Sequence, residues 1–173
     1  MKKNQKGFTL VELLAVIVIL AVIILIAVNA VLPQMQKARK KSFADEGLAF
    51  AKAAETAYVD RQETGSKAFT VADLKAHYVT KSDANYRGCI VVEADDQGNI
   101  TGKTIYLGQA KLNEGTYSDG KFMIVNVSAD TLGNDLDKKV KTFVTTGDGD
   151  KWLATYDSCT YQGAPAVSTQ SND

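Results

Sequence analysis

The chain has 173 residues, which suits a single domain, and its 20 basic side chains balance its 20 acidic ones. A balanced charge without a clustered basic face gives no indication of nucleic-acid binding. Two cysteines are too few for a disulfide scaffold and lack zinc-ligand spacing, so we expect no metal and no cofactor. The large aliphatic residues are concentrated near the N-terminus, which divides the chain into an apolar segment and a more polar remainder.

A short cationic leader precedes a long apolar run. Residues 1–7 contain three lysines and end at Gly7, as in a leader held on the cytoplasmic side by its charge. No polar side chain occurs from Leu13 to Val28. A helix over residues 8–32 would be about 37 Å long, and the hydrocarbon core of a bilayer is about 30 Å thick. We therefore expect a membrane-spanning helix over 8–32.

Glu12 is the only acidic residue in this apolar run. A charged side chain in a membrane helix costs on the order of 3 kcal/mol near the bilayer centre, so a partner is expected. Cleavage between Gly7 and Phe8 would create a cationic amine four residues from Glu12. In an assembly of identical helices, the Phe8 amine of one subunit would meet the Glu12 carboxylate of its neighbour and fix the stagger between them. A plain membrane anchor would leave Glu12 unexplained.

The sequence Lys-Gly-Phe-Thr-Leu-Val-Glu at residues 6–12, followed by the aliphatic run, resembles the class III signal peptide of type IV pilins and related pseudopilins. The resemblance covers about the first 40 residues, and the lysine-rich leader is similar to the Gram-positive type. It implies that a prepilin peptidase removes residues 1–7 by cutting after Gly7 and methylates the new N-terminus at Phe8. It also implies that Glu12 is needed for filament assembly.

The apolar run departs from the family pattern in one respect. Many family members carry a helix-breaking proline within the apolar block, whereas here Asn29 and Pro33 lie at its end. Any local melting of the helix in a fibre would therefore be displaced toward that end.

Helical spacing resumes after Pro33. One helix face collects the aromatic and small apolar residues Phe43, Phe50, Ala54, Ala57 and Tyr58. Gly65 is the expected stop signal. We therefore expect residues 33–62 to form the second half of one long helix, kinked near Pro33, with a globular head over 63–162 packed on it.

Within the head, Thr70 to Asp73 has the form of a capping box that starts a short helix ending near Tyr78. Strands are predicted at 89–94, 100–107, 121–127 and 152–156, the first two joined as a hairpin. One helix is predicted over 130–144, although Gly133 interrupts its spacing. Residues 163–173 are poor in apolar side chains and are predicted to be a flexible tail.

These elements predict an α+β fold in which the long N-terminal helix packs against an antiparallel β-sheet head, as in pilins. The predicted core contribution from the strands is Ile90, Val92, Ile105, Leu107, Ile124 and Val125.

Cys89 and Cys159 are a candidate disulfide pair, because both belong to the part expected outside the cell, where disulfides persist. On the chain-entropy view their bond would contribute about 4 kcal/mol. Two buried thiols that never meet are an equally good interpretation of the same sequence.

Three further patterns were weighed as chemical sites. Residues 115–121 match the phosphate-loop pattern, but Phe122 stands where Ser or Thr would hold magnesium and a strand pattern follows, which indicates a turn. Residues 147–150 contain two carboxylates without the further ligands of an EF-hand, so we interpret them as a turn. His77 lacks a third group that would orient it beside a cysteine nucleophile. We therefore expect no enzymatic activity.

The resemblance implies a structural role as the major subunit of a type IV pilus, with the same chain as its polymer partner. A prepilin peptidase and, indirectly, an assembly ATPase with its membrane platform are the other partners implied. The chain would begin as a single-pass precursor in the cytoplasmic membrane and end in an extracellular fibre serving adhesion, twitching motility or aggregation. The alternatives are a minor pilin, a type II secretion pseudopilin, and a membrane-tethered binding or enzymatic module.

Overall fold

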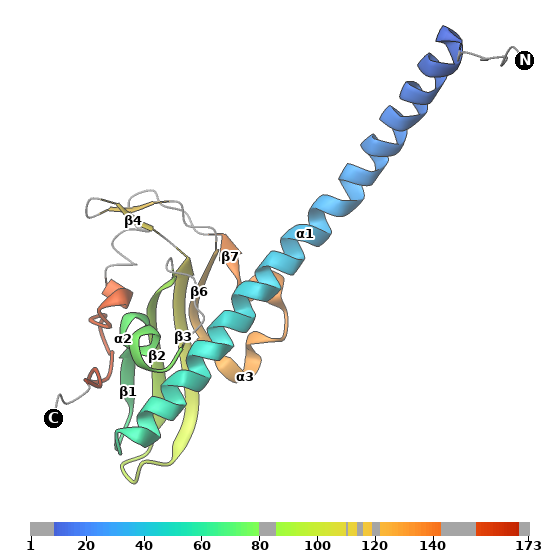
Figure 1. Cartoon of the computed structure of the whole chain (residues 1–173). Coiled ribbons are helices and arrows are strands. Elements are labelled where there is room, and N and C mark those ends of the chain that lie inside the picture. The colour runs from blue at the N-terminus through green and yellow to red at the C-terminus, as the bar shows by residue number, and fades with distance from the viewer. Residues whose placement is uncertain are drawn as a thin grey trace, which may run out of the picture. The chain divides into compact units, whose positions relative to one another are not determined.

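A computed structural model of the chain describes residues 9–79, 86–109, 111–113, 116–118, 122–142 and 155–169 (Figure 1). The chain divides into two units, Met1–Arg39 and Lys40–Asp173. Helix α1 runs over Leu10–Asp60 and contributes to both units.

In the first unit α1 continues through Pro33, which lies inside the helix. Proline has no N–H, so the carbonyl of Asn29 loses its usual helical donor at this position. The helix is nevertheless retained on both sides of Pro33, in agreement with the helical spacing that resumes there.

Helix α1 ends in a Schellman motif that the sequence analysis did not anticipate. The N–H of Gln62 donates to the carbonyl of Val59 (3.1 Å), and the N–H of Glu63 donates to the carbonyl of Tyr58 (3.1 Å). Gln62 adopts the left-handed conformation with φ of 52°, a position at which glycine is more common. Helix α1 therefore ends within two residues of the expected end at 62, but Gln62, rather than the predicted stop residue Gly65, turns the chain.

The second unit is built on one antiparallel sheet of five strands in the order β1-β2-β3-β6-β7. These strands are β1 (Lys67–Thr70), β2 (Tyr86–Ala94), β3 (Ile100–Gln109), β6 (Phe122–Ser128) and β7 (Lys141–Thr142). The other named elements of the described residues are the paired strands β4 (Lys111–Asn113) and β5 (Thr116–Ser118) and the short helices α2 (Val71–His77), α3 (Ala129–Leu132) and α4 (Leu136–Lys139). The predicted α+β architecture, a long helix packed on an antiparallel sheet, is confirmed.

The part of α1 that belongs to this unit packs closely on one face of the sheet. Its buried residues are mostly small, with three aromatic residues among them: Phe43, Ala44, Gly47, Phe50, Ala51, Ala53, Ala54, Ala57 and Tyr58. A Cβ atom added to Gly47 would lie 3.2 Å from Cδ1 of Ile124, so the backbone of the helix comes close to β6 here. The predicted buried helix face is confirmed.

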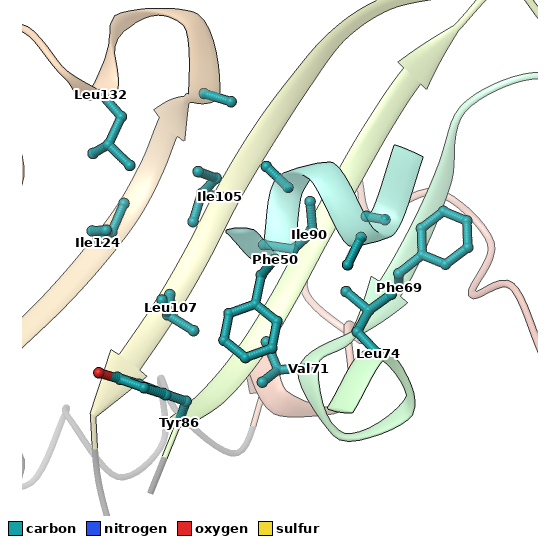
Figure 2. Close-up of a cluster of buried hydrophobic side chains, with 14 of the residues drawn as sticks. Phe50, Phe69, Val71, Leu74, Tyr86, Ile90, Ile105, Leu107, Ile124 and Leu132 are labelled. Atoms are coloured by element: carbon teal, nitrogen blue, oxygen red, sulfur yellow. The ribbon is translucent and has the colours of Figure 1, made fainter. Parts of the chain in front are cut away.

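Side chains of the strands alternate between the two faces of the sheet. The face toward α1 carries Phe69, Ile90, Val92, Ile105, Leu107 and Ile124, most of which are labelled in Figure 2. The opposite face carries a smaller buried cluster, here called the outer cluster, which consists of Ala68, Cys89, Val91, Tyr106 and Cys159. Five of the six predicted core positions are confirmed on the α1 side, whereas Val125 packs half-buried against the outer cluster. Ile124 and Val125 are adjacent and both apolar, so the sequence pattern did not distinguish which of the two would face α1.

A β-bulge lies beside Val125. Because Ile105 pairs with Val127 and Leu107 with Ile124, two residues of β6 stand opposite the single residue Tyr106. The second of them, Asn126, has φ of 53°, which asparagine tolerates better than most residues. Its Oδ1 accepts a hydrogen bond of 3.0 Å from the Tyr106 hydroxyl.

Most predicted elements are found, with two corrections. The hairpin of β2 and β3, the strand β6 and the Thr70 cap are confirmed, and Thr70 Oγ1 accepts from the Asp73 N–H at 3.2 Å. The single helix over 130–144 is wrong: α3 and α4 are separated by Asp135, whose φ of 61° is incompatible with a continuous helix. The strand predicted at 152–156 is also wrong where it is described, because 155–157 form a helical turn.

The expected flexible tail includes a segment that is hydrogen-bonded to the sheet. Ala68 donates its N–H to the Ala166 carbonyl (3.0 Å), and Ser168 donates its N–H to the Ala68 carbonyl (2.9 Å). Ser168 is buried, although serine is mostly an exposed residue. The prediction of a flexible tail used the low apolar content of the segment, but backbone hydrogen bonds rather than apolar side chains hold it.

Arg61 connects this segment to the end of α1 and to α2. Its Nη2 lies 2.6 Å from Asp73 Oδ2, and its Nη1 donates to the carbonyl (3.2 Å) and hydroxyl (3.1 Å) oxygens of Ser168. The guanidinium also lies 5.5 Å from the ring centre of Phe69 and 5.6 Å from that of Tyr78. Three segments distant in sequence therefore share one largely buried cation.

We expect Phe50→Ala to lower the free energy of unfolding by about 3–5 kcal/mol, because it leaves a cavity in a fully buried contact between α1 and the sheet. The matched control on the same helix is Val59→Ala, which should change it by less than about 0.5 kcal/mol because Val59 is 65% exposed. Urea unfolding of the detergent-solubilised full chain, followed by near-ultraviolet circular dichroism, measures both. Equal effects of the two variants would contradict the packing described.

Arg61→Met should destabilise the head by about 3 kcal/mol, because it leaves the Asp73 carboxylate partly buried without its cation. Lys138→Met is the control: the Lys138–Asp135 pair is as short, at 2.7 Å, but the lysine side chain is 82% exposed. That variant should cost less than about 0.5 kcal/mol. The same unfolding experiment compares them, and a small effect of Arg61→Met would show that Asp73 finds another partner.

Candidate functional site

The start of α1 is closed by a reciprocal capping box formed by Thr9 and Glu12. The Glu12 N–H donates to Thr9 Oγ1 at 3.3 Å, while Glu12 Oε2 accepts from the Thr9 N–H at 2.8 Å. The Thr9 hydroxyl also donates to the same oxygen, at 2.9 Å. The Glu12 and Thr9 side chains therefore each satisfy one backbone N–H that would otherwise lack a partner at a helix N-terminus.

The two bonds that the Glu12 carboxylate accepts from Thr9 both end on the same oxygen, Oε2. Among the described residues, no hydrogen bond or ion pair is recorded to Oε1. A carboxylate has acceptor sites on both oxygens, so Glu12 can cap its own helix and still accept a donor from outside the chain. The structure thus gives Glu12 a role that the sequence analysis missed, although the Thr-x-x-Glu spacing before an apolar run is itself a signature of this cap.

The helix that follows has no buried side at all. Every residue from Thr9 to Arg39 is exposed, including all the leucines, isoleucines and valines. A helix that is apolar on all sides is typically found in a membrane or inside a larger assembly. By length and composition, α1 contains one segment able to cross a membrane.

Asn29 is the one side-chain amide between Leu10 and Leu32, and the helix itself satisfies part of its hydrogen-bonding capacity. Its Nδ2 donates to the carbonyl of Leu25 at 3.1 Å. A polar side chain that bonds to the carbonyl four residues earlier is easier to place in lipid than a free one. This bond lies one turn before Pro33, where the backbone donor is missing.

The predicted site residues are distributed as follows. Gly7 and Phe8 lie outside the described residues, as does the loop at 147–150, whereas Glu12 lies in the first turn of α1. His77 contacts Asp73 on its own helix, with 3.2 Å between Nδ1 and Oδ1. Cys89 and Cys159 are brought together in the outer cluster as free, buried thiols. Within the described part of the chain, no group of three or more metal-ligating side chains is found.

The comparisons with known proteins agree with the geometry of this N-terminal segment. Residues 2–28 match the prokaryotic N-terminal methylation motif. This motif is the class III signal peptide of type IV pilins. No curated protein and no solved structure matches the chain.

The motif and the exposed apolar helix fit a membrane-anchored precursor of the type IV pilin-like and pseudopilin class. Such a motif favours a structural protein over an enzyme.

Proposed function

We propose that the chain is the major subunit of a type IV pilus, processed after Gly7 and polymerised through the N-terminal part of α1 into a surface fibre. The observation that carries the proposal is an apolar helix with every side chain exposed and a single carboxylate in its first turn. Such a helix needs a lipid or protein environment over its whole surface. A bundle of identical helices provides that environment when the chain leaves the membrane.

The apolar contacts alone would not define how neighbouring helices are staggered. Moving the helix from lipid into a protein bundle changes its hydrophobic environment little, because lipid tails and aliphatic side chains are similarly apolar. Close packing and polar contacts must then decide the register. A long aliphatic helix without such a contact would slide against its neighbours at small cost.

Glu12 supplies the polar contact in this proposal. Cleavage after Gly7 gives a cationic amine at Phe8, and the Phe8 amine of one subunit meets the Glu12 carboxylate of another. The capping bonds to Thr9 hold the carboxylate at the start of the helix and leave Oε1 for this partner. An ion pair removed from water depends strongly on both members, so it can select one stagger among many.

The processing enzyme, the assembly machinery and the role of the head in this proposal are taken from the type IV pilin class. A prepilin peptidase would cut and methylate the chain in the cytoplasmic membrane, and a separate ATPase with its membrane platform would drive assembly. The head, carried outward on the fibre, would determine adhesion, aggregation or surface motility. A minor pilin or a secretion pseudopilin would share the N-terminal segment but would be a trace component of purified fibres.

The processing step makes a direct prediction. Protein sheared from the cell surface should begin at N-methylated Phe8 and be the dominant chain of the filament fraction, as read by intact mass and N-terminal sequencing. A chain that still begins at Met1, or one released as a monomer after cleavage near Ala30, would contradict the proposal. Correct processing with only trace abundance in fibres would instead identify a minor subunit.

Three variants separate the assembly role of Glu12 from its capping role. Glu12→Gln keeps a side chain that suits the third helical position of a capping box but removes the charge. Thr9→Ala removes the capping hydroxyl and keeps the charge. We expect Glu12→Gln and Glu12→Ala to reduce surface fibres at least about tenfold, because a buried amine without its partner is strongly destabilising.

Thr9→Ala should keep fibres within about twofold of the parent chain, because loss of one cap costs only about 1 kcal/mol. Quantitative immunoblotting of sheared fibres gives the yield, and the mass of the membrane-bound chain confirms that each variant is still cleaved. Normal fibres from Glu12→Gln, together with few from Thr9→Ala, would assign Glu12 to capping alone and overturn the ion pair.

A further inference from the structure

The two cysteines lie on the outer face of the sheet, away from α1. Cys89 belongs to β2, where it pairs with Tyr106 of β3 and Thr70 of β1. Cys159 follows the helical turn at 155–157 and is separated from Cys89 by most of the head in sequence. Cys89 is 0% exposed and Cys159 is 3% exposed, and both belong to the outer cluster.

Polar contacts beside each cysteine bring the two segments together. The Gly88 N–H, adjacent to Cys89, donates to Asp157 Oδ1 at 3.1 Å, and Arg87 Nη1 lies 3.7 Å from Asp157 Oδ2. Asp157 is two residues before Cys159. A Cβ atom at Gly88 would lie 2.1 Å from the Tyr106 carbonyl oxygen, so only glycine fits the backbone there.

Aromatic stacking holds the chain in place both before and after Cys159, at Tyr156 and Tyr161. The rings of Tyr156 and Tyr106 are stacked, with centroids 4.6 Å apart and planes inclined by 12°. Tyr161 lies 4.9 Å from Tyr106 and 4.6 Å from Tyr156. Because Tyr106 is the register partner of Cys89, this stack holds the segment that carries Cys159 beside the Cys89–Tyr106 pair, and all three residues belong to the outer cluster.

The two cysteines are members of the same buried cluster. The neighbouring Cys159 sulfur favours the protonated form of Cys89 and, together with burial, raises the pKa of Cys89 well above its usual range. Once folded, Cys89 is therefore a protonated and unreactive thiol at neutral pH. Cys159 also has a left-handed backbone with φ of 53°, a conformation that a non-glycine residue keeps only where its surroundings impose it.

We propose that Cys89 and Cys159 form a disulfide bond that clamps the segment 155–169 onto the sheet of the exported head. The inference uses the proposed function only in placing the head outside the cell, where disulfides persist. The geometry carries the pairing itself, because two free thiols share one buried cluster held by hydrogen bonds and stacked rings.

The bond forms by thiol–disulfide exchange with an external disulfide, such as that of a dithiol oxidase. A thiolate of one cysteine attacks the external disulfide and expels one external thiolate, which gives a mixed disulfide. The second cysteine, as its thiolate, attacks the mixed disulfide and expels the other external thiolate. The two cysteine protons end on the two external thiols, and the external disulfide is reduced as the chain is oxidised. Exchange takes place as the head folds, because burial protects both sulfur atoms afterwards.

The disulfide would add a covalent bond to a segment that is otherwise held only by non-covalent contacts. Segment 155–169 is otherwise held by the Asp157 contacts, the tyrosine stack, and the bonds of Ala166 and Ser168 to Ala68 and Arg61. Each of these can open separately when the segment is pulled. A covalent bond between Cys89 and Cys159 removes the opening that would expose the whole outer cluster.

The test is the mass of the full chain alkylated with iodoacetamide in denaturant without reductant. Denaturant is essential, because buried free thiols would escape alkylation in the folded head. The chain sheared from cells should take up no label and should be about 2 Da lighter than the reduced chain. After reduction it should take up two labels. Two labels without reduction would overturn the proposal.

Two controls separate this inference from the proposed function. Cys89→Ser and Cys159→Ser should each leave one thiol that is labelled without reduction, which identifies the partner of the other. The full chain, unfolded in denaturant and refolded in detergent with a mixture of reduced and oxidised glutathione, should also become resistant to labelling in denaturant, whether or not it forms fibres. Reactive thiols in that sample, or equal rates of proteolysis within 155–169 before and after reduction, would contradict the clamp.

Discussion

An apolar helix with no buried side cannot remain in water, and this constraint organises the whole chain. From Leu10 to Leu32 the side chains of α1 are mostly large and aliphatic, and all of them are exposed. Such a surface requires lipid or other copies of itself. The same helix then changes character: beyond Lys40 it presents alanines and aromatic rings to the sheet. One secondary-structure element therefore serves two different environments.

The capping box at Thr9 and Glu12 alters the interpretation of the acidic residue in the apolar run. An isolated carboxylate in such a segment suggests an external partner, and a signal-peptide resemblance strengthens that suggestion. The structure adds a local role, because one oxygen of Glu12 already closes its own helix. The two roles are compatible, since the bonds use Oε2 alone. A carboxylate held in place by its own helix is also better positioned for a partner than a freely rotating one.

The sequence predicted the parts of the fold that depend on periodicity. The buried face of α1, the hairpin of β2 and β3, and the Thr70 cap follow from spacing and turn residues, and all are found. The missed features depend on contacts between distant residues. The bonds of Ala166 and Ser168 to β1, the Arg61 cluster and the bulge at Asn126 have no local pattern strong enough to indicate them. In the candidate site, Glu12 was identified and its bond to Thr9 was overlooked.

The backbone bonds of Ala68 to Ala166 and Ser168 have a consequence for crowding. β1 is the terminal strand of the sheet, and an open edge strand offers its N–H and C=O groups to any other chain. In a membrane or a fibre many identical heads are concentrated near one another, so edge-to-edge pairing between them would be a constant hazard. Here the C-terminal segment of the same chain occupies that edge at Ala68. The C-terminal segment thereby closes this edge of the sheet, at Ala68, to β pairing with another chain.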